Sequence, residues 1–177
     1  MSQYQVAHWI NGSLQSGSGT QTQDIFNPAT GQVQGQLHLA AVADLDAAVK
    51  SAQAASAAWG NTPALQRSRV MFRFLELVQS RREQLAECLT REHGKTREDA
   101  LGEIARGIEN IEFACGMPQL LKGEYTEQIA RGIDAWTTRQ PLGVVAGITP
   151  FNFPAMVPLW MFPLALGCGN CFILKPS

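Results

Sequence analysis

Charge is scarce in this chain, and neither sign predominates. The 177 residues include 14 Lys and Arg against 15 Asp and Glu, which gives a formal net charge of −1. Without a basic stripe the sequence offers no surface for nucleic-acid phosphates, and no acidic tail indicates a solvating arm. An apolar fraction of 45% excludes disordered and collagen-like classes. We expect a folded, soluble chain with a sizeable core.

Cysteine and histidine are also few. The four cysteines (Cys88, Cys115, Cys168 and Cys171) lack the spacing of a disulfide framework, and the three histidines are scattered. Cys168 and Cys171 have the CxxC form of a redox motif or half a zinc site, but no second pair accompanies them. We interpret them as two small core residues and predict no metal site. The first residues lack the charge pattern of a secretory signal, so we expect a cytoplasmic location.

Residues 140–174 contain no charged side chain, yet they do not form one long apolar run. A membrane-spanning helix needs about 20 apolar residues with an intact hydrogen-bond ladder. Here the stretch is broken by five prolines: Pro141, Pro150, Pro154, Pro158 and Pro163. This pattern favours a buried α/β core, with a membrane-associated protein as a distant alternative.

The first two thirds of the chain predict short strands followed by helices. Turn signals divide residues 8–39 into short extended runs such as 24–27 and 32–39. Helical periodicity then predicts helices over 42–60, 64–80, 82–93 and from 96 to about 118. Gly94 is a good C-cap residue and Thr96 a good N-cap residue. Apolar faces are expected at Leu45, Val49 and Ala52 in the first helix; at Val70, Phe74, Leu77 and Val78 in the second; and at Leu101, Ile104, Ile108, Ile111 and Cys115 in the fourth.

The last third predicts a hairpin and then one βαβ unit. Polar and apolar residues are interleaved over 122–140, with a turn near Gly132. An unbroken apolar run at 142–148 is typical of a strand buried on both faces. A helix over 155–166 and a second strand over 171–175 follow. Strand, helix and strand over this length predict a right-handed parallel crossover, the beginning of a doubly wound α/β sheet.

Parallel strands bring two polar segments to the same edge of that sheet. Ligands of open α/β sheets bind beyond the carboxyl ends of the strands, which here are residues 149–152 and Lys175. Asn152 offers an amide donor to an oxygen that gains negative charge, and Lys175 offers a cation to ribose hydroxyls or phosphate. From spacing alone, a turn asparagine and a surface lysine are the simpler interpretation.

Several motifs together resemble one family. They are residues 149–154 (Thr-Pro-Phe-Asn-Phe-Pro), 158–163 (Pro-Leu-Trp-Met-Phe-Pro), 174–177 (Leu-Lys-Pro-Ser), 9–12 (Trp-Ile-Asn-Gly), 27–31 (Asn-Pro-Ala-Thr-Gly), 92–95 (Glu-His-Gly-Lys), and the segment 106–116. Their order is similar to that of the aldehyde dehydrogenase superfamily. Phe151 and the 158–163 motif resemble its CoA-acylating methylmalonate-semialdehyde dehydrogenases.

The resemblance implies a role for each matching residue. Asn152 would be the oxyanion-hole amide that polarises the aldehyde. Thr149 and Phe151 would line the NAD site, and Lys175 would hold the adenosine ribose. Arg106 would recognise the substrate carboxylate, although its place off the apolar stripe also fits a solvated arginine. Coenzyme A would be the co-substrate that releases the acyl group, and the hairpin would be an oligomerisation arm of a homo-oligomer.

The resemblance further implies a division of the chain and missing parts. Residues 1–121 would be strands and helices of the NAD-binding domain, 122–141 the oligomerisation hairpin, and 142–177 the first βαβ unit. The domain with the nucleophilic cysteine would be absent, so we expect an aggregation-prone chain without dehydrogenase activity alone. The alternatives are a non-acylating aldehyde dehydrogenase and a non-catalytic interaction module that pairs with full-length subunits.

Overall fold

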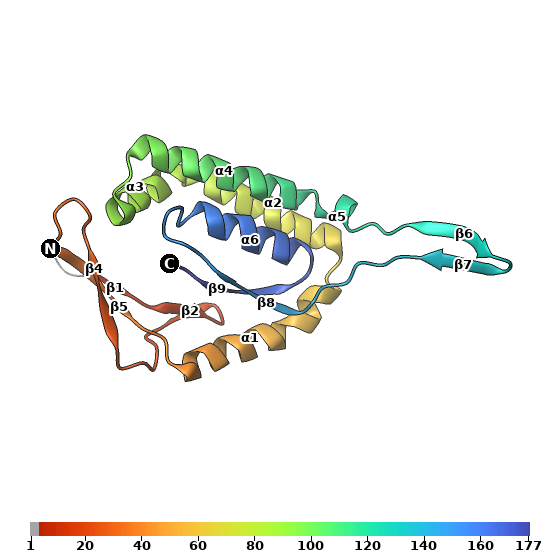
Figure 1. The fold of residues 1–177 in the computed structure, drawn as a ribbon, viewed down its shortest axis with the longest axis horizontal. Helices are drawn as coiled ribbons and strands as arrows, with labels where there is room; N and C mark the ends of the chain where they lie inside the picture. The colour runs from red at the N-terminus through yellow and green to blue at the C-terminus, as the bar shows by residue number, and fades with distance from the viewer. Residues whose placement is uncertain (1–3) are drawn as a thin grey trace.

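The computed structural model of the chain describes residues 4–177, which form a mixed α/β fold (Figure 1). Its elements in order are β1 (Tyr4–Val6), β2 (His8–Ile10), β3 (Ser13–Gln15), β4 (Thr22–Phe26), β5 (Val33–His38), α1 (Val42–Asn61), α2 (Ala64–Ser80), α3 (Arg82–His93), α4 (Arg97–Cys115), α5 (Met117–Leu120), β6 (Tyr125–Ala130), β7 (Ile133–Trp136), β8 (Val144–Ile148), α6 (Met156–Gly167) and β9 (Cys171–Lys175). These bounds lie close to the predicted ones because the turn and capping residues were visible in the sequence.

The N-terminal strands form two small sheets beside the helices. β1 pairs in parallel with β5, β4 pairs antiparallel with β5, and β2 and β3 form a hairpin. Tyr4 Oη donates a hydrogen bond of 2.9 Å to Glu92 Oε1 on α3. Burial and this carboxylate raise the pKa of Tyr4 to about 12. At α1, Asp44 accepts hydrogen bonds of 2.9 Å from the Ser18 amide and 2.8 Å from the Ala41 amide, which lower its pKa.

The core lies where α2, α3 and α4 pack together and against α6 (Figure 1). Its buried members are Val78, Ala86, Leu89, Ala100, Ile104, Ile111 and Leu159. Gly107 permits the crossing of α4 and α6, because a Cβ atom at this position would lie only 2.4 Å from Leu159 Cδ1. Gly94 ends α3 with a φ of 86°, and the Thr96 hydroxyl accepts from the Asp99 amide, as their positions predicted.

The βαβ unit is present with the predicted parallel pairing. β8 pairs with β9 from Val144 opposite Cys171 to Ile148 opposite Lys175. α6 covers one side of this two-stranded sheet and α1 the other (Figure 1). Buried Asn170 ties the unit together, since its Oδ1 accepts from the Leu142 and Gly143 amides at 2.7 and 3.1 Å and its Nδ2 donates to the Ala165 carbonyl at 3.2 Å.

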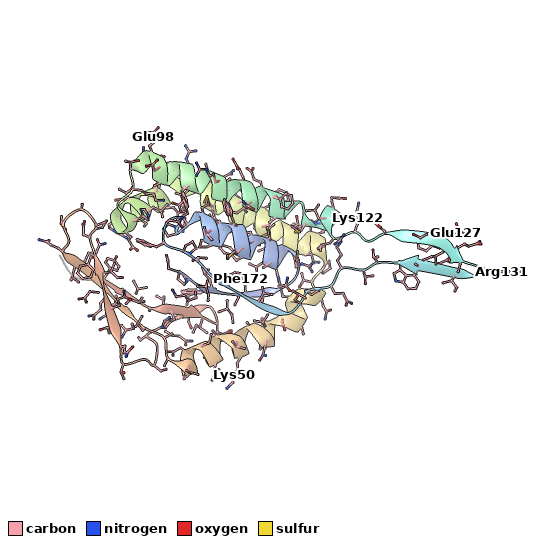
Figure 2. The ribbon with its side chains drawn as sticks, viewed as in Figure 1. Lys50, Glu98, Lys122, Glu127, Arg131 and Phe172 are labelled. Atoms are coloured by element: carbon pink, nitrogen blue, oxygen red, sulfur yellow. The ribbon has the colours of Figure 1, made fainter. Side chains whose placement is uncertain are left out.

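The hairpin of β6 and β7 extends away from the helices, with Glu127 and Arg131 near its tip (Figure 2). Gly132 has a φ of 73° in the predicted turn. The hydroxyl of Tyr125 on β6 donates a hydrogen bond of 2.8 Å to Oδ2 of Asp134 on β7. The larger apolar side chains of the hairpin are open to solvent: Tyr125, Ile129, Ile133 and Trp136 are 63%, 63%, 56% and 70% exposed.

Three burial predictions were wrong. On the expected inner face of α1, Val49 and Ala52 are partly buried but Leu45 is exposed. None of the residues of α1, all of which are described, is fully buried, because a sheet of two strands is too narrow to cover a 20-residue helix. On α2, Val70 and Leu77 face solvent while Arg67, Ser68, Met71 and Val78 are buried. Ile148 is 77% exposed rather than buried on both faces, since β8 has only one neighbouring strand.

Among the helices of residues 4–177, none combines the length and apolar character that crossing a membrane requires. The uncharged stretch is instead divided between β8, α6 and β9.

Candidate functional site at the carboxyl edge of β8 and β9

The loop after β8 and the end of β9 meet at one edge of the sheet, as the parallel pairing predicted. The Thr149 amide donates to the Lys175 carbonyl at 3.2 Å. Thr149 is only 4% exposed, and its hydroxyl oxygen has no hydrogen-bond partner among the described residues. A buried polar atom without a partner costs free energy, so its presence at this edge is consistent with a place for a ligand.

Asn152 and Phe151 lie on the exposed side of this loop. Asn152 presents its side chain to solvent, while its backbone carbonyl accepts a hydrogen bond of 3.2 Å from Lys95 Nζ. Phe151 is 54% exposed, and its ring lies 5.0 Å from that of His93 at the end of α3. The Asn152 side chain is therefore free to donate while its backbone is held.

A buried ion pair beneath the loop was not predicted. Glu103 of α4 is 1% exposed and forms an ion pair with Lys95. Its Oε1 also accepts hydrogen bonds from the Ala155 and Met156 amides at 2.8 and 3.0 Å, at the start of α6. The sequence did carry a signal, because Glu103 lies on the apolar stripe of α4 beside Ala100, Ile104 and Gly107, where a carboxylate needs a partner.

The other two predicted site residues are less closely held. Lys175 is exposed at the end of β9, on the edge that carries Thr149. Arg106 is exposed on α4, three residues after Glu103. The structure thus gathers Thr149, Phe151, Asn152 and Lys175 around one edge, whereas it places Arg106 on a neighbouring helix.

The four cysteines lie elsewhere. Cys171 is the first residue of β9, whereas Lys175 is the last. Cys168 Sγ lies 3.7 Å from Met117 Sδ. Cys115 is buried among α2 and α4, and burial raises the pKa of the Cys115 and Cys171 thiols. All four are free thiols, and Cys88 is exposed on α3. None of these positions, all within the described residues, belongs to the edge that carries Asn152.

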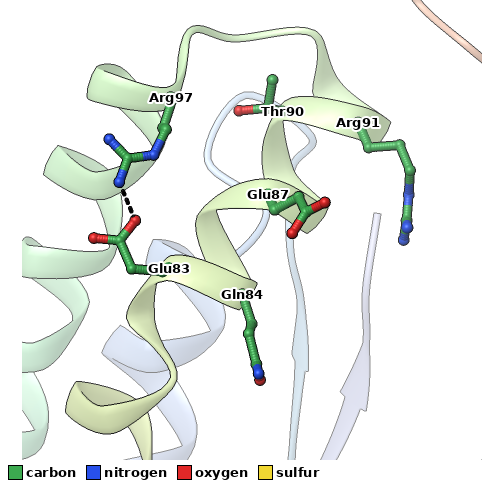
Figure 3. Close-up of a pocket in the computed structure, with 6 residues that line it drawn as sticks. All are labelled: Glu83, Gln84, Glu87, Thr90, Arg91 and Arg97. Atoms are coloured by element: carbon green, nitrogen blue, oxygen red, sulfur yellow. Dashed lines mark hydrogen bonds and ion pairs between the residues drawn. The ribbon is translucent and has the colours of Figure 1, made fainter.

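A hollow of about 520 Å³ lies on the α3–α4 side of the molecule (Figure 3). Its lining residues are Glu83, Gln84, Glu87, Thr90, Arg91 and Arg97. Arg97 and Glu83 form an ion pair across part of it, so two of its charges neutralise each other. Because it contains none of the predicted site residues, we assign it no chemistry.

A parallel βαβ unit with polar residues at its carboxyl edge defines a class of α/β protein that binds ligands beyond its strand ends. Comparison with known proteins gives the family. Residues 14–177 match the model described as the aldehyde dehydrogenase family, and the chain belongs to that family.

Individual relatives point to one branch. The chain is 52% identical over 170 residues to a malonate-semialdehyde dehydrogenase of Pseudomonas aeruginosa, a match that covers 96% of the chain and 34% of the relative. A structure of a methylmalonate-semialdehyde dehydrogenase from Oceanimonas doudoroffii superimposes with a TM-score of 0.96 at 54% identity, covering 98% of the chain and 36% of that protein. A candidate methylmalonate-semialdehyde dehydrogenase from Sinorhizobium meliloti, crystallised with NAD, superimposes with a TM-score of 0.97 at 52% identity, covering 99% and 36%. The chain spans about a third of the length of these relatives.

Proposed function

We propose that this chain supplies the oxyanion donor and part of the dinucleotide site of an NAD-dependent, CoA-acylating dehydrogenase for methylmalonate or malonate semialdehyde. The observation that supports this most directly is the gathering of Asn152, Thr149 and Lys175 at the carboxyl edge of β8 and β9. The names of the relatives support the substrate class, and the crystal structure of the Sinorhizobium meliloti relative with NAD supports the cofactor.

Asn152 acts by donating a hydrogen bond from its side-chain amide to the aldehyde oxygen. As the carbonyl is attacked, negative charge grows on this oxygen, and a donor fixed in advance stabilises the charge without reorganising. The exposed side chain and anchored backbone of Asn152 suit this role.

The edge residues fit one part of a dinucleotide. The unpartnered hydroxyl of Thr149 and the exposed ammonium group of Lys175 offer donors suited to ribose hydroxyls or phosphate, and Phe151 offers an apolar wall. Bound NAD supplies the acceptor for the hydride that leaves the substrate. Arg106 recognises the carboxylate of the semialdehyde, since a guanidinium group pairs with both carboxylate oxygens.

We further propose the domain division that the family resemblance implies. Residues 1–121 and 142–177 belong to the NAD-binding domain, and 122–141 form an arm. We also propose that none of the four cysteines is the nucleophile and that the chain alone is inactive; the distance of the described cysteines from the Asn152 edge supports this.

A hybrid enzyme tests this function: residues 1–177 replace the matched segment of the Pseudomonas aeruginosa enzyme. We expect NADH formation that requires both malonate or methylmalonate semialdehyde and coenzyme A, and none from the chain alone. NADH formation independent of coenzyme A would instead indicate a non-acylating aldehyde dehydrogenase. A folded but inactive hybrid that binds full-length subunits would favour an interaction module.

The exposed apolar side chains of the hairpin support its role as an oligomerisation arm. The double substitution Ile129→Lys and Ile133→Lys introduces charge into such a contact. We therefore expect this variant of the hybrid enzyme to dissociate into smaller species in sedimentation velocity. Leu45→Lys, at a similarly exposed residue of α1, is the matched control and leaves the assembly intact. An unchanged sedimentation coefficient for the hairpin variant would rule out this contact.

A further inference from the structure

We propose that Lys95 and Glu103 are positioning residues for Asn152, so that a buried ion pair between the α3–α4 loop and α4 sets the orientation of the oxyanion donor. The inference rests on the proposed function of Asn152. It assigns a role to two residues that contact neither the proposed substrate nor the proposed cofactor.

The carboxylate of Glu103 contacts both the start of α6 and Lys95. Its Oε1 accepts from the Ala155 and Met156 amides, which begin α6. These amides have no partner within the helix, so a carboxylate there satisfies two donors and interacts favourably with the helix dipole. Its other oxygen, Oε2, forms the ion pair with Lys95. Glu103 therefore fixes where the loop after β8 ends.

Lys95 extends this anchor to Asn152 itself. Its Nζ donates to the Asn152 carbonyl at 3.2 Å and lies 4.7 Å from the centre of the Phe153 ring. The side chains of Lys95 and Glu103 are 9% and 0% exposed, so water does not compete strongly for the ion pair that holds Lys95 in place. Lys95 thus holds the backbone of the residue whose side chain is offered to solvent.

The anchor has a functional reading because stability alone does not require this arrangement. A buried ion pair contributes little net stability compared with apolar residues that fill the same space. A fixed geometry, however, has a large effect on catalysis, since a misplacement of about 1 Å can cost about 10²-fold in rate. The loop after β8 is held at its start by the Thr149 amide and at its end by the Ala155 amide. Among the described residues, the one hydrogen bond to the backbone of Asn152 between these two points comes from Lys95.

Kinetics of the hybrid enzyme test the proposal. We expect Lys95→Met and Glu103→Gln to lower kcat at least about tenfold while changing KM for the semialdehyde and NAD less than about twofold. Lys95→Arg keeps the positive charge and recovers part of kcat. Glu109→Gln, at an exposed glutamate of the same helix, is the matched control and leaves kcat unchanged.

A double substitution separates positioning from general stability. In the Asn152→Ala variant the side chain that Lys95 positions is already gone. Adding Lys95→Met to this variant should therefore cause no further loss of kcat. Full additivity, or variants that lose thermal stability while each folded molecule keeps its kcat, would overturn the proposal. If Asn152→Ala itself left kcat unchanged, the proposed function of Asn152 would fail, and that result is distinct from an effect of Asn152→Ala without one of Lys95→Met.

Hydrogen exchange on the hybrid enzyme provides a measurement that needs no activity. We expect Lys95→Met to speed exchange in peptides covering residues 151–156, including the Ala155 and Met156 amides, while peptides from α2 stay unchanged. Equal exchange in all peptides, or no change at 151–156, would contradict the anchor.

Discussion

Asn152→Ala is expected to lower kcat of the hybrid enzyme about 10²–10³-fold, the usual effect of losing one oxyanion-hole donor. The substitution removes the amide that stabilises charge on the aldehyde oxygen, but it leaves the backbone contact of residue 152 with Lys95 available. Because the donor acts mainly in the transition state, KM for the semialdehyde changes much less than kcat. Steady-state NADH formation with saturating coenzyme A measures both.

The matched control for this prediction is Asn61→Ala, at an exposed asparagine that ends α1 on the other side of the β8–β9 sheet. It should leave kcat unchanged. A kcat within about twofold of the parent for Asn152→Ala would mean that Asn152 is only a turn residue, the simpler interpretation of the sequence.

Arg67→Ala is expected to cost about 3 kcal/mol of the free energy of unfolding, which corresponds to a fall of about 6–12 °C in Tm for a chain of this size. Arg67 is 6% exposed on α2 and donates to three backbone carbonyls. Its Nε bonds to Gly167 at the end of α6 at 3.1 Å, and its Nη1 bonds to Gly60 and Thr62 at the end of α1. Alanine leaves these carbonyls without a donor in a dry environment and removes the packing of the side-chain stem.

Urea unfolding of the 177-residue chain, followed by circular dichroism, measures this effect. Arg67→Met keeps most of the packing but none of the donors, so its loss estimates the hydrogen bonds alone. Arg69→Ala, at an exposed arginine two residues on, is the control and should change stability by less than about 0.5 kcal/mol. A similarly small effect for Arg67→Ala would show that water replaces the lost donors.

The polar residues of this molecule illustrate how far sequence patterns extend. Apolar periodicity located α4 and its buried Ile104 and Ile111, because α2, α3 and α6 all pack against the apolar face of this helix. The same reasoning failed on α2, where Arg67 and Ser68 occupy the inner face and Val70 lies outside. Arg67 is buried because carbonyls at the nearby end of α1 and the distant carbonyl of Gly167 at the end of α6 accept its hydrogen bonds. No local pattern contains the contact with Gly167.

The sequence by itself determined the mixed α/β class, the order of the elements and the meeting of residue 149 with Lys175 at one edge. These follow from local capping, periodicity and the rule that strands joined by a helix run parallel. Only the tertiary structure decided that Lys95 and Glu103 form a buried pair beneath Asn152, and that Leu45 of α1 and Ile148 remain exposed in residues 4–177. The reason is physical: a buried charge and an exposed apolar face depend on what the rest of the fold brings against them, not on neighbours along the chain.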